Sequence, residues 1–284
     1  DDRKKLVNNY LEKSMSKKGI SRVDEAMRYS LLAGGKRIRP LLLMATADAV
    51  GGNGYNYLPV ACGLEMIHTY SLIHDDLPLM DDDDYRRGRL TNHKVFGDAM
   101  ALLAGDALLT LAFEVMLEQK NISPSILIET VHEVAMCAGN YGMVGGQALD
   151  IDDEGKEISI TELNTLHAAK TGALFIAAVR SGSRLAGADS GQLLALTKFA
   201  DLIGLAFQIT DDILDVEGDP TEMGKAAGSD AKKSKPTYVT ICSLEGAKAL
   251  AEKTLNEALA CLDIFGDKAE PLRQITNMVC NRKS

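Results

Sequence analysis

Two clusters of aspartate are the part of this sequence whose residue types and spacing could do chemistry. The stretch "HDDLPLMDDDDYRRGR", residues 74–89, contains six aspartates, and "QITDDILDVEGD", residues 208–219, carries a second group. Carboxylates this close repel one another at neutral pH unless positive charge lies among them. A single acidic run is usually a solvated surface loop. Two clusters that each close an apolar helical segment favour a functional site instead.

The spacing of the aspartates predicts how the two clusters are presented. Asp211 and Asp215 are four residues apart, so they lie on one face of a helix. Asp75 ends another apolar helix, because Pro78 cannot donate a backbone hydrogen bond and its ring clashes with the preceding turn. A helix that ends there lets Asp81 turn back toward Asp75. The two carboxylate groups can then face each other across a cavity.

Carboxylate oxygens without histidine or thiol partners are ligands for a hard cation. Magnesium binds through a few carboxylates and completes its coordination with water and substrate phosphate oxygens. The number of carboxylates indicates more than one ion, and the calcium-loop spacing D-x-D-x-D-G is missing. The clusters therefore predict a magnesium–diphosphate site.

Basic residues support an anionic substrate. The segment "GGKRIRP", residues 34–40, places Lys36, Arg37 and Arg39 just before an expected helix N-terminus, where backbone N–H groups favour an anion. Arginine can bind phosphate through two parallel hydrogen bonds. Any one of these cations taken alone is more typical of a solvated surface charge. Further candidates are Arg86, Arg87, Arg89, Lys170, Lys225 and Lys235.

Composition narrows the class of protein. The 284 residues are 46% apolar and carry a formal net charge of −9, and no extended basic face is visible, so a nucleic-acid partner is not expected. The five cysteines show no paired metal spacing, which is typical of reduced thiols in a cytoplasmic protein. The most apolar window, residues 99–117, contains Gly105, Asp106 and Glu114, which favours a core helix over a membrane span.

Helical periodicity dominates, and strand signals are almost absent outside residues 235–242. We therefore expect one all-α domain over residues 1–284. The glycine- and lysine-rich segment 217–236 is expected to be a mobile lid. Helices are predicted at 2–17, 22–33, 40–50, 57–77, 92–117, 124–140, 142–150, 161–181, 190–216, 237–243, 246–264 and 268–281.

Together these motifs resemble those of the trans-prenyltransferases, the short-chain isoprenyl diphosphate synthases. "DDLPLMD" is similar to the family's first aspartate-rich motif with two extra residues, and "DDILD" to its second. "GGKRIRP" and "RRG" are similar to its basic segments, and the resemblance extends from about residue 31 to residue 238. It implies a helical bundle around a deep central cavity, usually a homodimer, with about three Mg²⁺ ions held by bound diphosphate.

The resemblance also assigns roles at matching positions. The main magnesium ligands would be Asp75, Asp81 and Asp211, with Asp76, Asp212 and Asp215 as further catalytic carboxylates. The diphosphate of isopentenyl diphosphate would be bound by Lys36, Arg39, His68 and Arg87. The allylic diphosphate would be bound by Arg86, Lys170, Lys225 and Lys235, with Thr171 and Gln208 lining the reacting region and Gln147 as a weaker candidate.

His68 lies on an apolar helix, where a lone histidine is usually a core residue. It lies seven residues before Asp75, which is two helical turns away on the same face. This spacing favours the ligand interpretation. His74, beside the motif, is expected to be structural.

The implied reaction is ionisation of the allylic diphosphate, attack by the double bond of isopentenyl diphosphate, and loss of a proton. Tyr70 lies five residues before Asp75, roughly 7.5 Å along the helix, and would block a longer chain, with the small Ser71 beside it. This favours farnesyl diphosphate (C15), made from dimethylallyl and geranyl diphosphates, as in bacterial-type farnesyl diphosphate synthases. Alternatively, Tyr70 only packs in the core and other residues set the length.

Several alternatives remain at this stage. A geranylgeranyl diphosphate synthase (C20) differs only in product length. A non-catalytic subunit that modulates a partner synthase would typically lose one aspartate motif, and both are intact here. A terpene cyclase fits less well, because the basic loop and the second motif favour two diphosphate substrates.

Overall fold

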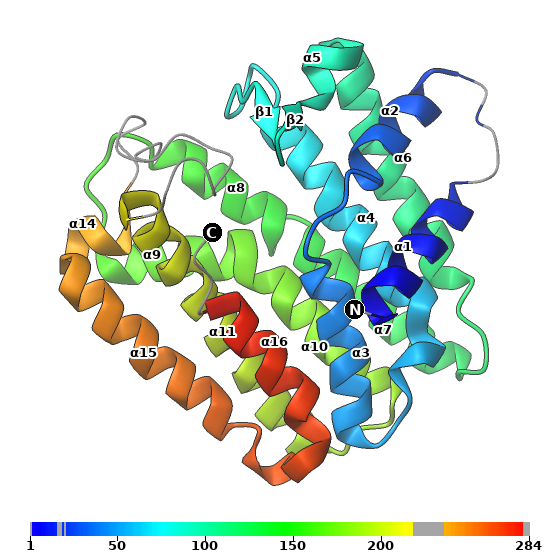
Figure 1. The fold of residues 1–284 in the computed structure, drawn as a ribbon, viewed down its shortest axis with the longest axis vertical. Helices are drawn as coiled ribbons and strands as arrows, with labels where there is room; N and C mark the ends of the chain where they lie inside the picture. The colour runs from blue at the N-terminus through cyan, green and yellow to red at the C-terminus, as the bar shows by residue number, and fades with distance from the viewer. Residues whose placement is uncertain (1, 16–18, 20, 218–235, 281–284) are drawn as a thin grey trace.

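The computed structural model describes residues 2–15, 19, 21–217 and 236–280, and within them the chain is almost entirely helical, as predicted (Figure 1). Residues 218–235 of the predicted lid, which include the predicted ligands Lys225 and Lys235, lie outside the described residues. The elements are α1 (Asp2–Ser14), α2 (Val23–Leu31), α3 (Ile38–Val50), η1 (Gly54–Tyr57), α4 (Leu58–Asp75), β1 (Tyr85–Arg86), β2 (Arg89–Leu90), α5 (Asn92–Phe96), α6 (Asp98–Leu117), α7 (Pro124–Ala138), α8 (Met143–Asp152), α9 (Ile160–His167), η2 (Ala168–Gly172), α10 (Ala173–Leu185), α11 (Ser190–Glu217), α14 (Tyr238–Cys242), α15 (Leu244–Ala260), η3 (Asp263–Ala269) and α16 (Glu270–Cys280).

Two long helices, α4 and α10, hold the centre of the bundle. α4 packs against α1, α2, α3 and α6, while α10 packs against α3, α7 and α11. Most residues of both helices are buried, which is typical of a helix with neighbours on several sides. One continuous cluster of buried apolar residues extends from Val7 to Leu272.

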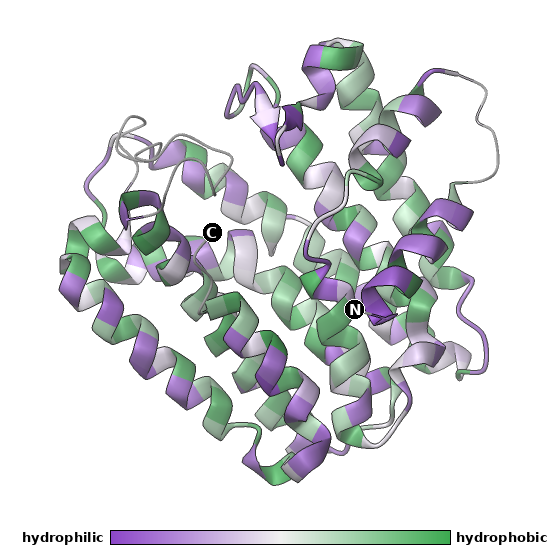
Figure 2. Ribbon diagram, viewed as in Figure 1, coloured by the Kyte–Doolittle hydropathy of each residue, from purple (hydrophilic) through white to green (hydrophobic). Residues whose placement is uncertain are grey.

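The later helices are built around α11. This helix packs against α10 on one side and against α15 on another (Figure 1). The outer helices α15 and α16 alternate hydrophilic and hydrophobic stripes in Figure 2, as expected for helices with one face in water. A second small apolar cluster of Leu163, Ile209, Tyr238 and Ala247 joins α9, α11, α14 and α15.

The predicted helix 92–117 is wrong in one respect, because it is divided into α5 and α6 at Gly97. This residue has φ +89°, a left-handed conformation that glycine adopts without steric cost. The helix predicted at 161–181 extends to Leu185 and contains the π-helical turn η2. A short antiparallel hairpin, in which Tyr85 pairs with Leu90, was not predicted.

Two helices, α6 and α11, are long and apolar enough by composition to cross a membrane. In their most apolar windows 39% and 44% of the residues are buried inside the described structure. Core helices of folded proteins pass the same compositional test. α6 packs along the central helix α4, as expected for a core helix.

Candidate active site

The first acidic motif has the predicted geometry. Helix α4 ends at Asp75, and the chain then reverses, so that the backbone N–H of Asp81 donates to the carbonyl of Asp75 at 2.8 Å. A second backbone bond, from Asp82 to the carbonyl of Leu77 at 3.1 Å, closes the same turn. The turn brings Asp81 beside Asp75 at the end of the helix.

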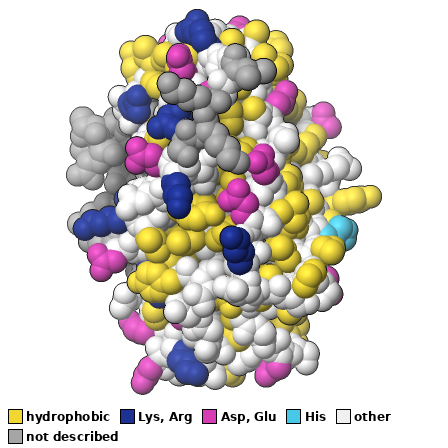
Figure 3. All heavy atoms as spheres, turned by 90° about the vertical axis from the view of Figure 1, so that its right-hand side faces the viewer, with side chains coloured by type: hydrophobic (Ala, Val, Ile, Leu, Met, Phe, Trp, Pro, Cys, Tyr) yellow, Lys and Arg dark blue, Asp and Glu magenta, His cyan; other side chains and the backbone are white. Residues whose placement is uncertain are grey.

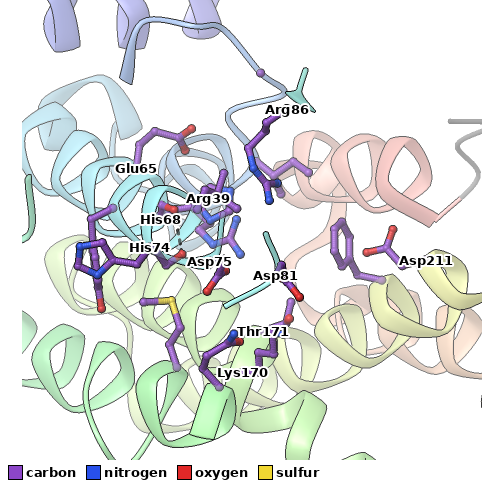
Figure 4. Close-up of a pocket in the computed structure, with 18 of the residues that line it drawn as sticks. Arg39, Glu65, His68, His74, Asp75, Asp81, Arg86, Lys170, Thr171 and Asp211 are labelled. Carbon is purple, nitrogen blue, oxygen red and sulfur yellow. Dashed lines mark hydrogen bonds between the residues drawn. The ribbon is translucent and has the colours of Figure 1, made fainter. Parts of the chain in front are cut away.

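The second motif lies on the last turns of α11. Asp211 shares a large cavity with Asp75 and Asp81, and Figure 4 shows these two carboxylates near Lys170 and Thr171, with Asp211 farther along the same cavity. The two aspartate motifs therefore meet at one space, although they are more than a hundred residues apart in the sequence.

The cavity has a volume of about 1020 Å³ and extends between α3, α4, α8, η2 and α11. Its wall combines charged groups with apolar side chains such as Met80, Met143 and Phe207. Most of the predicted site residues line it, namely Lys36, Arg39, His68, Tyr70, Ser71, Asp75, Asp81, Arg86, Arg87, Gln147, Lys170, Thr171, Gln208 and Asp211.

Asp76, Asp212 and Asp215 do not line this cavity. Asp76 is buried and accepts hydrogen bonds from the Arg86 guanidinium at 2.6–2.9 Å. Asp212 is also buried, and its Oδ2 accepts the backbone N–H of Tyr238 at 2.7 Å. These two carboxylates hold neighbouring elements through those bonds, and their predicted catalytic roles stay predictions.

The carboxyl of Asp75 is crowded by other negative groups. Its pKa is raised to about 6, mainly by burial and also by Asp81 and Asp76, although Lys170 and Arg86 act in the opposite direction. A cation bound between the motifs would relieve this repulsion.

The described residues contain no ready-made group of three or more His, Cys, Asp or Glu side chains that could hold a metal alone. The donor set nevertheless fits Mg²⁺, because Asp75 at the end of α4, Asp81 in the turn after it and Asp211 on α11 line one cavity with room for water and substrate oxygens. Asp75, Asp81 and Asp211 are the side chains that would hold it.

The basic wall of the cavity is formed around Arg39. The pKa of Arg39 is lowered to about 10, mainly by burial and also by Arg87, although Glu65 acts in the opposite direction. The Arg39 Nε is buried and has no hydrogen-bond partner among the described residues. Burial and the surrounding arginines hold the pKa of His68 well below its ordinary value, so this ring is neutral. An anionic ligand would satisfy this concentration of positive charge.

Arg37 is a correction to the predicted basic group. Its guanidinium donates to Glu65 at 2.8 Å, to the side chain of Asn8 at 2.9 Å and to the carbonyl of Leu31 at 2.8 Å. Its φ of +54° turns the side chain inward at the start of α3. Arg37 also lines the cavity, but these bonds bury its guanidinium and fix the loop carrying Lys36.

The π-helical turn η2 presents Lys170 and Thr171 to the cavity. Such turns carry one extra residue and occur frequently at functional sites. Lys170 forms an ion pair with Asp150 of α8 at 2.6 Å. Two glycines let neighbouring helices approach the turn closely. A Cβ on Gly146 would lie 2.1 Å from the backbone nitrogen of Lys170, and a Cβ on Gly204 would lie 3.1 Å from the Cα of Gly172.

Gly146→Ala is expected to destabilise the protein by about 1–3 kcal/mol and to lower kcat, because backbone atoms of η2 would have to move. Thermal unfolding and steady-state kinetics would measure both effects. The matched control is Gly191→Ala, where the nearest atom to the new Cβ is an Asp189 side-chain oxygen at 3.3 Å. A Gly146→Ala protein as stable and as active as the control would contradict this account of η2.

Tyr70 is the residue predicted to limit the length of the product chain. Its ring is 5% exposed, lines the cavity and contacts His74 edge-on at a centroid distance of 5.6 Å. The Nε2 of His74 is 3.0 Å from the carbonyl oxygen of Leu102 on α6, which agrees with the expected structural role of this histidine. The Ser71 hydroxyl donates to the carbonyl of His68 at 2.9 Å and so turns back to its own helix.

The sequence argument missed His167 at the end of α9. Its Nδ1 is 3.0 Å from the Gln208 amide nitrogen, and its ring stacks on Tyr238 at 5.5 Å. The pKa of His167 is lowered to about 4, mainly by burial and also by Lys170, although Asp150 acts in the opposite direction. Its position three residues before Lys170 is the only sequence signal that could have indicated a role.

The burial of His167 predicts how the stability of the protein depends on pH. A histidine in an unfolded chain has a pKa of about 6.5. Because the pKa of His167 in the folded protein is about 4, the neutral ring stabilises the folded state. This stabilisation is complete above pH 6.5 and is lost as the pH falls toward 4. The difference in unfolding free energy between wild type and His167→Asn should shrink by roughly 2 kcal/mol between pH 7.5 and pH 4.5. Urea unfolding at the two pH values measures it, and an unchanged difference would contradict a neutral buried ring.

Comparison with known proteins agrees with this site. The chain matches the polyprenyl synthetase family over residues 20–275. The farnesyl diphosphate synthase of Geobacillus stearothermophilus is 50% identical over 251 residues, which cover 87% of this chain and 84% of the relative. The geranylgeranyl diphosphate synthase of Cyanophora paradoxa is 44% identical over 285 residues, which cover 100% and 95%.

A solved structure extends the likeness to the fold. The geranylgeranyl pyrophosphate synthetase of Pyrococcus horikoshii superposes with a TM-score of 0.91 at 29% identity, covering 99% of this chain and 96% of that one. The chain therefore belongs to the polyprenyl synthetase family. The predicted class, a prenyltransferase with the all-α fold, is confirmed.

Proposed function

We propose that this protein is a farnesyl diphosphate synthase, which condenses isopentenyl diphosphate with dimethylallyl and then geranyl diphosphate. One observation carries the proposal: two aspartate motifs and a basic wall meet at a single cavity of about 1020 Å³ whose remaining wall is largely apolar. The charged part fits two diphosphates and the apolar part fits a hydrocarbon chain. The similar farnesyl diphosphate synthase of Geobacillus stearothermophilus supports the assignment.

The allylic substrate would bind with its diphosphate toward the aspartates. About three Mg²⁺ ions, when bound, would neutralise the leaving diphosphate and so favour ionisation of the allylic C–O bond. Lys170 and Arg86 add positive charge on the same side, and their contacts with Asp150 and Asp76 fix where that charge lies. The predicted contributions of Lys225 and Lys235 concern residues outside the described part of the chain.

Isopentenyl diphosphate would bind at the basic wall formed by Lys36, Arg39, His68 and Arg87. Arg39 keeps a buried Nε without a partner among the described residues, which a phosphate oxygen would satisfy. The neutral His68 can donate one hydrogen bond without adding charge. The double bond of this substrate would then attack the allylic cation, and the released diphosphate would take the proton.

Product length is proposed from Tyr70. The growing chain would extend along α4 from Asp75 toward this ring, which lines the cavity and is held by His74. The alternative is a C20 product, and a relative named as a geranylgeranyl diphosphate synthase is 44% identical. The bulky buried ring favours C15.

Association into a homodimer and a cytoplasmic location are also proposals. Several large apolar side chains of α6 and α7 are exposed, and hydrophobic side chains are spread over the face seen in Figure 3. A second copy that covers α6 and α7 would remove this surface from water. The five free thiols are typical of a reducing compartment. Light scattering after gel filtration would give twice the chain mass of 30.6 kDa for the dimer.

The function is tested by an elongation assay with Mg²⁺, labelled isopentenyl diphosphate and an allylic diphosphate. Formation of labelled prenyl product that requires both substrates, and that stops when EDTA removes the metal, would support the proposal. A folded protein that forms no elongated product under these conditions would overturn it and favour a non-catalytic subunit.

A further inference from the structure

The amide of Gln208 is held by a histidine that does not line the cavity. Gln208 lies on α11 one turn before Asp211, and its Nε2 is 3.0 Å from the Nδ1 of His167. With the amide in this orientation its nitrogen donates and Nδ1 accepts, which places the histidine proton on Nε2. Among the described residues, this is the hydrogen bond that the Gln208 side chain forms. Since it uses the amide nitrogen, the amide oxygen is left to face the cavity.

The surroundings of His167 suit a fixed acceptor. Burial lowers its pKa to about 4, so the ring is neutral and Nδ1 keeps its lone pair at neutral pH. Its Nε2 is buried and has no hydrogen-bond partner among the described residues. Leaving a buried polar atom unpaired costs free energy, so other contacts must hold the ring in this place. Two charged groups act on the pKa of His167. Asp150 on α8 raises it and Lys170 on η2 lowers it.

A second layer of contacts holds the histidine ring. Tyr238 stacks on it at a centroid distance of 5.5 Å and an interplanar angle of 24°. The Tyr238 hydroxyl donates to Asn164 at 2.6 Å, and its backbone N–H donates to Asp212 at 2.7 Å. The ring is thus fixed by α9, α11 and α14 together, and among the described residues it contacts the cavity lining through Gln208.

We propose that His167 is a positioning residue, which holds the Gln208 amide with its oxygen directed at the allylic carbon that becomes cationic. The inference rests on the proposed function. A fixed carbonyl dipole stabilises positive charge that develops in the transition state and does so without reorganisation at that moment. Loss of the His167 contact would let the amide rotate and present its N–H₂ group to the cation instead.

The expected consequence is a change in kcat with little change in KM. His167→Leu should lower kcat for the elongation of geranyl diphosphate by about 10–100-fold, while the KM values of both diphosphates stay within about threefold. In a Gln208→Leu background, the same His167→Leu change should cost no more than about twofold, because His167 acts through Gln208.

Two amide variants make the test independent of folding losses. His167→Asn places an acceptor near the Nδ1 position and should retain kcat within about fivefold of wild type, whereas His167→Gln places its amide near the Nε2 position and should behave like His167→Leu. Equal kcat values for His167→Asn and His167→Gln would overturn the proposal. So would additive losses for His167→Leu and Gln208→Leu.

The direction of the amide is tested with a cationic probe. The probe is a geranyl diphosphate analogue with a protonated amine at the cationic carbon, compared with a non-ionising thiodiphosphate of the same shape. His167→Leu should weaken inhibition by the amine by about tenfold and leave inhibition by the thio compound within about twofold. Stronger inhibition by the amine would show that the N–H₂ end faces the cavity. Turnover by wild type tests the proposed function separately from these comparisons.

Discussion

Asp211→Asn and Asp75→Asn should each lower kcat by about a thousandfold or more, since each change removes one carboxylate from the site that would neutralise the leaving diphosphate. Both side chains line the cavity, from α11 and α4 respectively. Asparagine keeps the shape of aspartate and removes its charge, so the loss would report on charge rather than on packing. Steady-state elongation assays at saturating Mg²⁺ measure the effect.

Asp212→Asn is the matched control for this prediction. It neutralises the adjacent carboxylate, which is buried and accepts the backbone N–H of Tyr238. The asparagine oxygen can accept the same bond, so kcat should fall by no more than about tenfold. Equal losses at Asp211 and Asp212 would contradict the placement of only Asp211 at the cavity.

Unfolding can be separated from loss of charge by the thermal midpoints. Burial and neighbouring carboxylates disfavour the charged form of Asp75, so the Asp75→Asn protein should melt at or above the wild-type temperature. An inactive variant that melts well below wild type would leave the loss explained by misfolding, contrary to this account.

Tyr70→Ala should shift the main product from C15 to C20 or longer, because removal of the ring extends the cavity beside α4. The lost ring is 5% exposed and contacts His74, so the variant should also lose about 3–5 kcal/mol of stability. Separation of the dephosphorylated alcohols by chain length measures the shift.

Tyr70→Phe is the control for the hydroxyl group. It keeps the ring, and its product should remain C15. If Tyr70→Ala still makes only C15, other residues set the chain length and Tyr70 is only a core residue.

The geometry of the first motif could be predicted from the sequence because it depends on local rules. Pro78 ends α4 by removing a donor and crowding the preceding turn, and the chain then returns Asp81 to Asp75, as the backbone bond between them shows. The meeting of the two motifs could be predicted because each group of carboxylates ends an apolar helix, so the two groups can face one cavity.

Other parts of the site depend on contacts between distant segments. The π-helical turn η2 has no local signal, and it lies where Gly146 of α8 and Gly204 of α11 approach closely. Arg37 was named with the basic segment because its neighbours in the sequence are basic, but in the fold it pairs with Glu65 of α4 in the core. His167 could not be recognised because Gln208, its partner, is 41 residues away.

The measurement that tests the central claim most directly is the chain length of the wild-type product. The protein would be incubated with Mg²⁺, isopentenyl diphosphate and geranyl diphosphate, and the dephosphorylated alcohols would be separated by length. The account predicts farnesol as the main product. Geranylgeraniol as the main product would contradict the role of Tyr70, and no elongated alcohol from folded protein would contradict the proposed function itself.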